Sequence, residues 1–302
     1  MAVPPTEAAV PGVLDPATLG PGVPGDPSAA RFSRVRAIGG IWIPAFLVAA
    51  ILFLCFLWPI IGPVPQPTGG SILNSNLPSF SPGHLFGTDV NGNDEWSRLL
   101  YGGRASLEVS MAVTAIGLLL GGLLGAFAGY IGGWRESVIM RVFDVLIAFP
   151  ALVLAVAVAE RLGPGELNTI WALSFFSVPA LARIARAATL RVREQNYIVA
   201  AGLSGSGHLR TLLRHIMPNI LPELMTFALL GIGIVIVLEG ALSFLGLGIQ
   251  APSPSWGNMI ASGQQILSAQ PKFTMLPSAA LFITVVCFNL LGESLRARWS
   301  AQ

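Results

Sequence analysis

The sequence predicts an all-α polytopic membrane protein with six transmembrane helices. Of its 302 residues, 53% are hydrophobic and only 11% are charged, whereas a soluble domain carries about 25% charged residues. The mean hydropathy is +0.71, and uncharged stretches long enough to cross a bilayer recur along the chain. A net charge of +2 is too small for the electrostatic attraction that nucleic-acid binding needs. A soluble enzyme and a nucleic-acid binder are therefore disfavoured.

The first third of the chain contains one span and two polar segments. Residues 1–37 are rich in Pro, Ala and Gly without apolar periodicity, which predicts a disordered cytoplasmic tail. The uncharged segment 38–62 is the first predicted transmembrane helix. It is too long, and starts too late, for a secretory signal peptide. Residues 63–107 contain many turn-forming residues and are expected to form an extracytoplasmic loop.

Residues 108–302 are predicted to form a membrane core with the other five helices. The second span falls in the uncharged run 109–134, whose glycines recur every three or four residues and favour close helix packing. The centres of the later spans are residues 145–159, 167–182, 224–247 and 273–292. The connection 248–272 is expected to be a loop, in which Trp256 marks the outer membrane interface.

Basic residues near the span ends set the orientation. With the N-terminus inside, thirteen of them are cytoplasmic and four lie outside. The inner set is Arg31, Arg34, Arg36, Arg135, Arg141, Arg183, Arg186, Arg191, Arg193, Arg210, Arg214, Arg296 and Arg298, and the outer set is Arg98, Arg104, Arg161 and Lys272. Both termini are therefore predicted to be cytoplasmic.

Motifs for catalysis and cofactor binding are missing from the sequence. It has no GxxxxGK[ST] phosphate loop, HExxH, CxxC or GxSxG pattern, and its three histidines are scattered. Cys55 and Cys287 lie in apolar runs and are expected to pack there rather than form a disulfide or bind a metal. We expect no catalytic residue, metal or cofactor in this chain, so any work must draw on a gradient or on a partner.

The cytoplasmic segment 196–219 combines a glycine-rich bend with an amphipathic helix. Leu209, Leu212, Leu213 and Ile216 share one face at helical spacing, and Pro218 is predicted to begin a new element. On these grounds alone, a helix lying on lipid headgroups and a helix that docks a partner are equally good interpretations.

Three charged residues in or near the predicted spans are candidates for function. Arg141 and Asp144 are three residues apart, so they can form a local ion pair or a contact that changes with conformation. Glu239 lies deep in the fifth predicted span, where a carboxylate costs about 2.5–3.5 kcal/mol on insertion scales. It must therefore face a cavity or a partner, either lining or gating a translocation path or making a buried hydrogen bond.

Acidic residues also cluster in the outer segment. Asp89, Asp94 and Glu95 are candidates for docking a partner, and neutralisation by Arg98 or Arg104 is the alternative.

Residues 197–225 resemble the EAA loop of ABC importer permeases, with Ala200 and Ala201 at the two alanines and Gly205 at the glycine. Val199 stands where that family usually has Glu. The resemblance implies a coupling helix that sits in a cleft of the ATPase subunit. The residues that it assigns to coupling are Ala200, Ala201, Gly205, Arg214, His215, Ile216 and Pro218.

Four further blocks are similar to the dipeptide/oligopeptide (peptide/nickel) transport family, in the order of its C-type permease subunit. They are FGTDVNGNDEWSRLLYGGRASL (86–107), AGYIGGWRESVIMRVFDVLIAFPAL (128–152), ALSFLGLGIQAPSPSWGNMI (241–260) and FNLLGESLR (288–296). Asn93 replaces the usual Arg of the first block.

This resemblance implies the importer type I permease fold in a bacterial cytoplasmic (inner) membrane, and import of dipeptides or oligopeptides by alternating access. The implied partners are a second homologous permease, two ATPase subunits or domains that bind ATP and Mg, an extracytoplasmic substrate-binding protein and membrane lipid. Alternatives are a permease for nickel or another small solute, a gradient-driven secondary transporter, and a structural subunit without a path. The acid–base relays and related halves of secondary transporters are not visible in the sequence.

Overall fold

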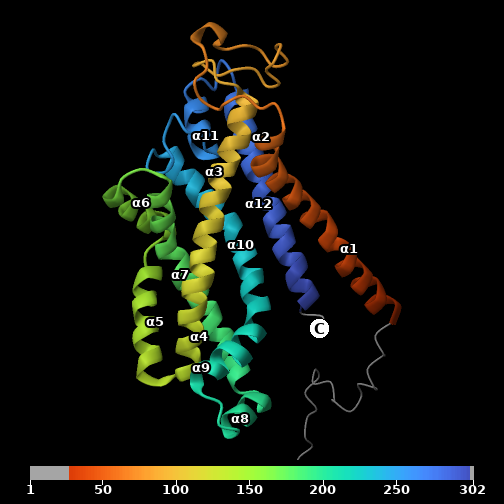
Figure 1. The fold of residues 1–302 in the computed structure, drawn as a ribbon, viewed down its shortest axis with the longest axis vertical. Helices are drawn as coiled ribbons and strands as arrows, with labels where there is room; N and C mark the ends of the chain where they lie inside the picture. Colours follow the sequence, from red (N-terminus) through yellow and green to blue (C-terminus); the bar gives the residue numbers. More distant parts are fainter. Residues whose placement is uncertain (1–26, 300–302) are drawn as a thin grey trace, which may run out of the picture.

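The computed structural model describes residues 27–299 and consists of long helices, arranged as a bundle (Figure 1). The helices are α1 (Pro27–Leu52), α2 (Trp58–Ile61), α3 (Glu95–Ile116), α4 (Gly122–Ile131), α5 (Gly133–Ile147), α6 (Ala151–Leu162), α7 (Glu166–Arg193), α8 (Asn196–Leu203), α9 (His208–Thr211), α10 (Met217–Phe244), α11 (Trp256–Gln264) and α12 (Lys272–Trp299). The short turns are the π-helical η2 (Phe53–Leu57), η4 (Gly117–Gly121) and η5 (Leu212–Ile216) and the 3₁₀ turn η3 (Ile72–Asn74).

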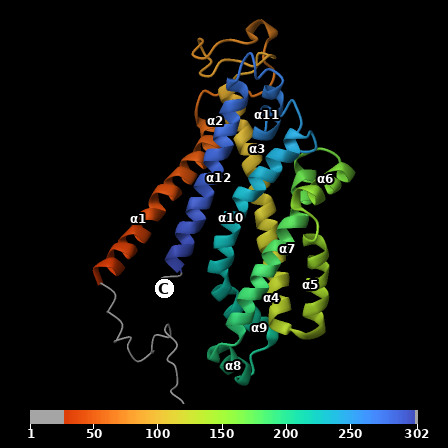
Figure 2. The ribbon, with the colours of Figure 1, turned by 180° about the vertical axis from the view of Figure 1, so that it is seen from behind.

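Five helical segments of the described chain are long and apolar enough to cross a membrane, and the pair α5 and α6 together make a sixth candidate. The start of α1 and the end of α12 lie toward the end of the bundle that carries α8, while the loop before α3 and helix α11 lie at the other end (Figure 1, and from behind in Figure 2). The predicted all-helical, multi-span fold is confirmed.

Two predicted boundaries differ from the structure. The outer loop ends at Asp94 instead of residue 107, because the Asp94 side chain accepts a hydrogen bond from the backbone N–H of Ser97 and so starts α3. The connection 248–272 contains α11, which begins at a capping box formed by Ser255 and Asn258. Most of the predicted tail 1–37 lies outside the described residues, but α1 already begins at Pro27.

The third predicted span is broken rather than continuous. Helices α5 and α6 meet at 88° across a break of a few residues. Pro150 explains the break, because proline has no N–H to donate and disfavours helical geometry at the residue before it. With 15 residues, α5 is about 22 Å long and stops short of the roughly 30 Å of the hydrocarbon core.

The glycines of the second span pack closely against α7, as the sequence predicted. A Cβ atom on Gly121 or Gly125 would collide with the α7 backbone, at the carbonyl oxygens of Val178 and Ala182 respectively. Small residues therefore let the two helices approach to backbone contact, the usual way in which helices associate in lipid.

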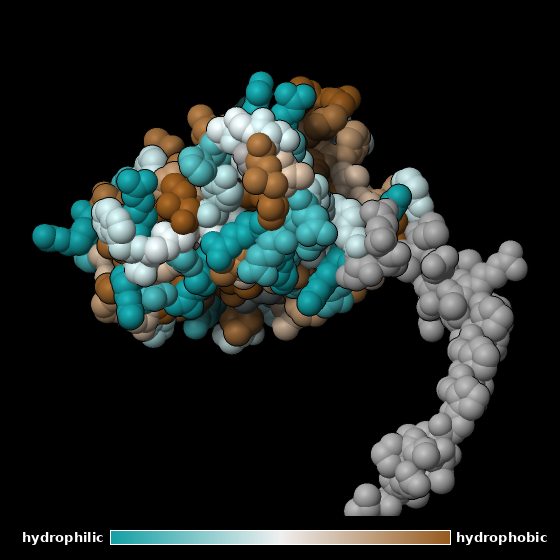
Figure 3. Space-filling view, turned by 90° about the horizontal axis from the view of Figure 1, so that it is seen from below, coloured by the Kyte–Doolittle hydropathy of each residue, from teal (hydrophilic) through white to brown (hydrophobic). Residues whose placement is uncertain are grey.

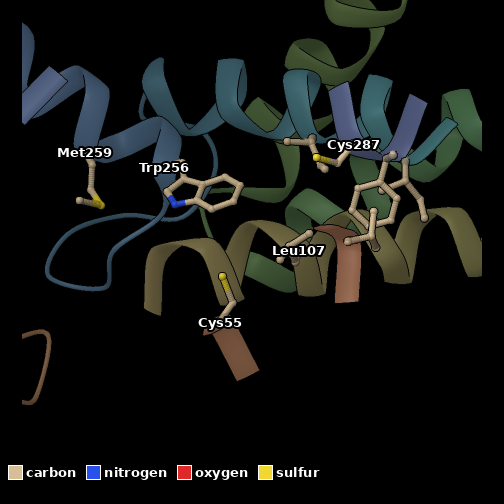
Figure 4. Packing of buried hydrophobic residues seen from close by; sticks show 9 residues of the cluster. Cys55, Leu107, Trp256, Met259 and Cys287 are labelled. Carbon is tan, nitrogen blue, oxygen red and sulfur yellow. The ribbon is translucent and has the colours of Figure 1, made fainter. Parts of the chain in front are cut away.

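Trp256 is a core residue and not an interface anchor, which corrects the prediction. Only 2% of it is exposed, and its indole N–H donates to the Leu99 carbonyl at 3.0 Å. It belongs to a cluster with Leu107, Cys55 and Met259 that joins α3, η2 and α11 (Figure 4). Gly103 leaves the space for the indole, since a Cβ there would clash with the ring. Cys55 and Cys287 are both buried free thiols.

Candidate functional site

Helix α8 and the turn after it form the cytoplasmic tip of the molecule (Figure 1). Gly205 has φ = +79°, and the Ser206 N–H donates to the Ala201 carbonyl at 3.0 Å. This is a Schellman motif, in which a glycine in the left-handed conformation ends a helix and reverses the chain. The Ala200 carbonyl accepts from the Ser204 N–H at 3.0 Å, which is the ordinary helical hydrogen bond that precedes this turn.

The helix after the bend continues directly into the membrane. Helix α10 begins at Met217 with Pro218 in its first turn, as predicted, but residues His208–Phe244 together form one candidate span. The π-helical turn η5 immediately precedes Met217 and Pro218. Its wider backbone accommodates the proline, which lacks an N–H, without ending the helix. The part of the segment after the bend, from His208 onward, is therefore continuous with α10.

Only part of the predicted apolar face is buried. Leu212 and Ile216 are 5% and 0% exposed and pack in a cluster with Ala126 of α4 and Ala185 of α7, whereas Leu209 and Leu213 are exposed. The four residues are therefore divided between the surface that packs into the bundle and the exposed surface of the helix. The cluster also holds Ile198 of α8, and the Tyr130 hydroxyl lies 3.2 Å from Nδ1 of His208.

The remaining side chains of this segment leave an apolar surface at the cytoplasmic end. Five hydrophobic residues are exposed there: Tyr197, Val199, Leu203, Leu209 and Leu213. Seen from below, exposed hydrophobic side chains stand among hydrophilic ones at this end (Figure 3). Of the residues assigned to coupling, Ala200, Gly205, Arg214 and Pro218 are exposed, Ala201 and His215 are half-buried, and Ile216 is fully buried. Ile216 therefore anchors the segment rather than contacting a partner.

A second polar feature is a groove of about 570 Å³ between α5 and α7, which lie side by side (Figure 1 and Figure 2). The predicted pair of Arg141 and Asp144 does not form. Asp144 instead accepts from Arg183 of α7 at 2.6 Å, and Glu136 pairs with Arg186 one turn further along. The three-residue spacing suggested a local partner, but the packing of α5 against α7 places Arg183 beside Asp144.

Arg141 lines the same groove, is exposed, and makes no ion pair with any residue in the described range. No signal in the sequence marked Arg183 as a partner of Asp144, because it stood among the arginines assigned to the cytoplasmic segment.

The ion pair between Asp144 and Arg183 is half exposed and lies well along α5 from its cytoplasmic end, although the sequence had assigned Arg183 to the cytoplasmic segment. Trp134 is 72% exposed and marks the cytoplasmic interface of α5. Asp144 follows ten residues later, which places it about 15 Å deeper along the helix. The side chains of Arg183 and Asp144 are 49% and 44% exposed. Charges at that depth face a cavity or another protein and not lipid.

Glu239 is enclosed within the chain. It is 0% exposed, and one of its carboxylate oxygens accepts from the Ser243 hydroxyl at 2.7 Å, while the other has no hydrogen-bond partner in the described structure. Ser243 in turn accepts from the Ile249 N–H at 3.0 Å. Because its side chain is fully buried, Glu239 does not line a translocation path in this structure. Its polar contacts lie at the end of α10, where they fix the following turn.

A multi-span helical bundle with an exposed apolar surface at one end and a charged groove between α5 and α7 is typical of a membrane transport subunit. Residues 121–300 match the family described as binding-protein-dependent transport system inner membrane component. The described residues contain no group of three or more side chains able to hold a metal ion.

Similar proteins agree with this class. The chain is 35% identical over 268 residues to the dipeptide transport system permease protein DppC of Alkalihalophilus pseudofirmus, covering 87% of this chain and 84% of the relative. It is 41% identical over 216 residues to the glutathione transport system permease protein GsiD of Pectobacterium atrosepticum, covering 72% of each. For GsiD of Escherichia coli O6:K15:H31 the identity is 42% over 222 residues, or 74% and 73% of the two chains.

The chain belongs to the family of binding-protein-dependent transport system inner membrane components. It is accordingly a multi-pass inner-membrane permease of an ABC importer and is not itself a catalyst. Permeases of this class carry no cofactor, and ATP is bound by the partner ATPases. The importer also requires another permease and a binding protein.

Proposed function

We propose that this permease passes short peptides across the membrane, and that the groove between α5 and α7 forms part of its translocation path. The half-exposed pair Asp144–Arg183 at membrane depth carries this assignment. A permease must offer a polar surface inside the bilayer, and ion pairs that cannot face lipid supply one.

The break between α5 and α6 supports the same surface. Non-helical backbone at membrane depth is tolerated only where it is buried in protein or lines a water-filled cavity. Transporters commonly place their substrate sites at such discontinuous helices. Arg141, which has no ion-pair partner among the described residues, supplies a donor for the carboxylate of a passing peptide.

Peptide is the proposed cargo class because the similar permeases are named for dipeptide and glutathione transport. The proposed assembly contains a second homologous permease, two ATPase subunits or domains and an extracytoplasmic substrate-binding protein. The apolar surface of Tyr197, Val199, Leu203, Leu209 and Leu213 is the proposed contact with an ATPase. Val199 contributes apolar area there rather than a charge.

Thiol accessibility tests the path. In the complete transporter, with Cys55 and Cys287 replaced by Ala, Arg141→Cys is expected to react with a charged, water-soluble thiol reagent. Transported dipeptide should slow that reaction. The control is Phe46→Cys on α1, where the native side chain is 72% exposed on a lipid-facing helix and the thiol should stay unreactive. Equal protection of both thiols from the charged reagent would rule out a water-filled path at this groove.

A further inference from the structure

A cavity of about 350 Å³ opens at the extracytoplasmic end, between the loop before α3 and the region of α11. Its lining includes the charged residues Asp89, Glu95 and Arg98 and the apolar residues Met259, Ile266 and Phe273. The cavity shares no lining residue with the groove between α5 and α7, so it is a separate site.

Three charged residues line this cavity, and two of them, Asp89 and Arg98, have direct hydrogen-bond or ion-pair partners. Asp89 accepts from the N–H groups of Asn91 and Asn93, both at 2.8 Å, and its other oxygen lies 3.6 Å from Nε of Arg98. Arg98 also donates to the Pro67 carbonyl at 3.2 Å. Its guanidinium is therefore already engaged by other groups.

The other predicted partners are also occupied. Asp94 caps α3 and lies 2.8 Å from Nδ1 of His84. Arg104, an expected neutralising residue, pairs with Glu108 at 2.8 Å instead.

Glu95 is the third charged residue that lines the cavity. The residue is only 2% exposed and lines the cavity, and its carboxylate makes no hydrogen bond and no ion pair within 4.0 Å in the described part of the chain. Arg98 and Lys272 lie near enough to attract its charge without contacting it. Burying a carboxylate without a partner is unfavourable. A cation entering the cavity would supply that partner.

The shape of the cavity narrows the choice of cation. A lysine or arginine side chain has an apolar stem and a charged tip. The stem would lie along Met259, Ile266 and Phe273, and the tip would reach Glu95, which lines the same cavity. A small hydrated metal ion would leave the apolar wall without a contact.

We propose that this cavity receives a lysine or arginine side chain of the extracytoplasmic binding protein, with Glu95 as its counter-ion. The inference rests on the proposed function for the identity of the partner. The cavity lies on the side where that protein must dock, and it is lined by the loop before α3 and by the extracytoplasmic ends of α3, α11 and α12 rather than by the groove assigned to the path. Both observations favour a docking partner over a peptide in transit.

The test is the affinity of the binding protein for the complete transporter in nanodiscs. Glu95→Gln keeps the size of the side chain and removes its charge, and we expect at least tenfold weaker docking with a smaller dependence on salt. Glu108→Gln, which removes another carboxylate of α3, should dock as wild type. Ser262→Trp on α11 fills the cavity from its exposed rim and should weaken docking even if Glu95→Gln fails to assemble.

Unchanged docking in Ser262→Trp, or in an assembled Glu95→Gln transporter, would overturn the proposal. So would normal docking combined with a raised peptide KM at saturating binding protein, because the cavity would then take the peptide's ammonium group. Failure of the proposed function looks different, since the wild-type transporter would then dock its binding protein but import no peptide.

Discussion

Replacement of Gly205 by valine tests whether the turn at the cytoplasmic tip needs a residue in the left-handed backbone conformation. Its φ of +79° lies in the left-handed region, and a Cβ there would meet nothing within 4 Å. Steric contact with the rest of the chain therefore contributes no penalty. The cost is the backbone strain alone, about 1–2 kcal/mol for an ordinary L-residue and more for a β-branched one.

That strain translates into a measurable loss. Since 1.4 kcal/mol corresponds to a factor of ten, the equilibrium constant for forming the Schellman turn should fall about 5- to 30-fold. We expect Gly205→Val to reduce ATP-driven uptake per assembled transporter by at least fivefold, while the amount in the membrane stays normal. Uptake in proteoliposomes and copurification of the ATPase measure the two quantities.

Two control variants separate strain from simple bulk. Gly207 has φ = −65°, and a Cβ there would also meet nothing within 4 Å, so Gly207→Val should transport as wild type. Gly205→Asn should be intermediate, because asparagine tolerates the left-handed conformation better than valine. Normal uptake by Gly205→Val would refute the role of this turn in coupling.

The packing and the buried carboxylate give two further predictions. Gly125→Ala forces a methyl group against the Ala182 carbonyl and should lower the free energy of unfolding by about 1–3 kcal/mol. This loss would be measured as a lower thermal midpoint in detergent. In the control Gly231→Ala the added methyl group meets nothing within 4 Å, so the midpoint should not change. Glu239→Gln keeps the acceptor for Ser243 and should be nearly silent in uptake, ATP turnover and copurification, whereas Glu239→Leu removes that acceptor and should weaken assembly. Wild-type behaviour of the Leu variant would show that this carboxylate has no structural role.

Local composition was sufficient to predict most of the fold. Long uncharged runs located the spans, and the glycine spacing of residues 117–129 predicted close helix packing, because both signals are carried by neighbouring residues. The break at Pro150 was not predicted, since a proline within an apolar run is also compatible with a kinked continuous helix. The helical start at Asp94 was missed because its segment is polar and rich in turn-forming residues.

In the candidate site, too, only features set by neighbouring residues could be predicted from the sequence. Gly205 could be placed at a bend because a left-handed residue is a local requirement. The partner of Asp144 could not, since Arg183 is 39 residues away in the chain and the contact depends on how α5 packs against α7. Burial of Glu239 followed from the cost of a charge in lipid, but its Ser243 partner depends on the side chains packed around the end of α10.

The energy source is the most direct test of the account. Proteoliposomes containing both permeases and the ATPases, with binding protein on the substrate side, should accumulate labelled dipeptide when ATP is supplied to the ATPase side. Uptake should persist when an uncoupler collapses the proton gradient at constant ATP, and it should stop when ATP is withdrawn. Uptake that disappears with the gradient while ATP is held constant would contradict the account and favour a gradient-driven transporter.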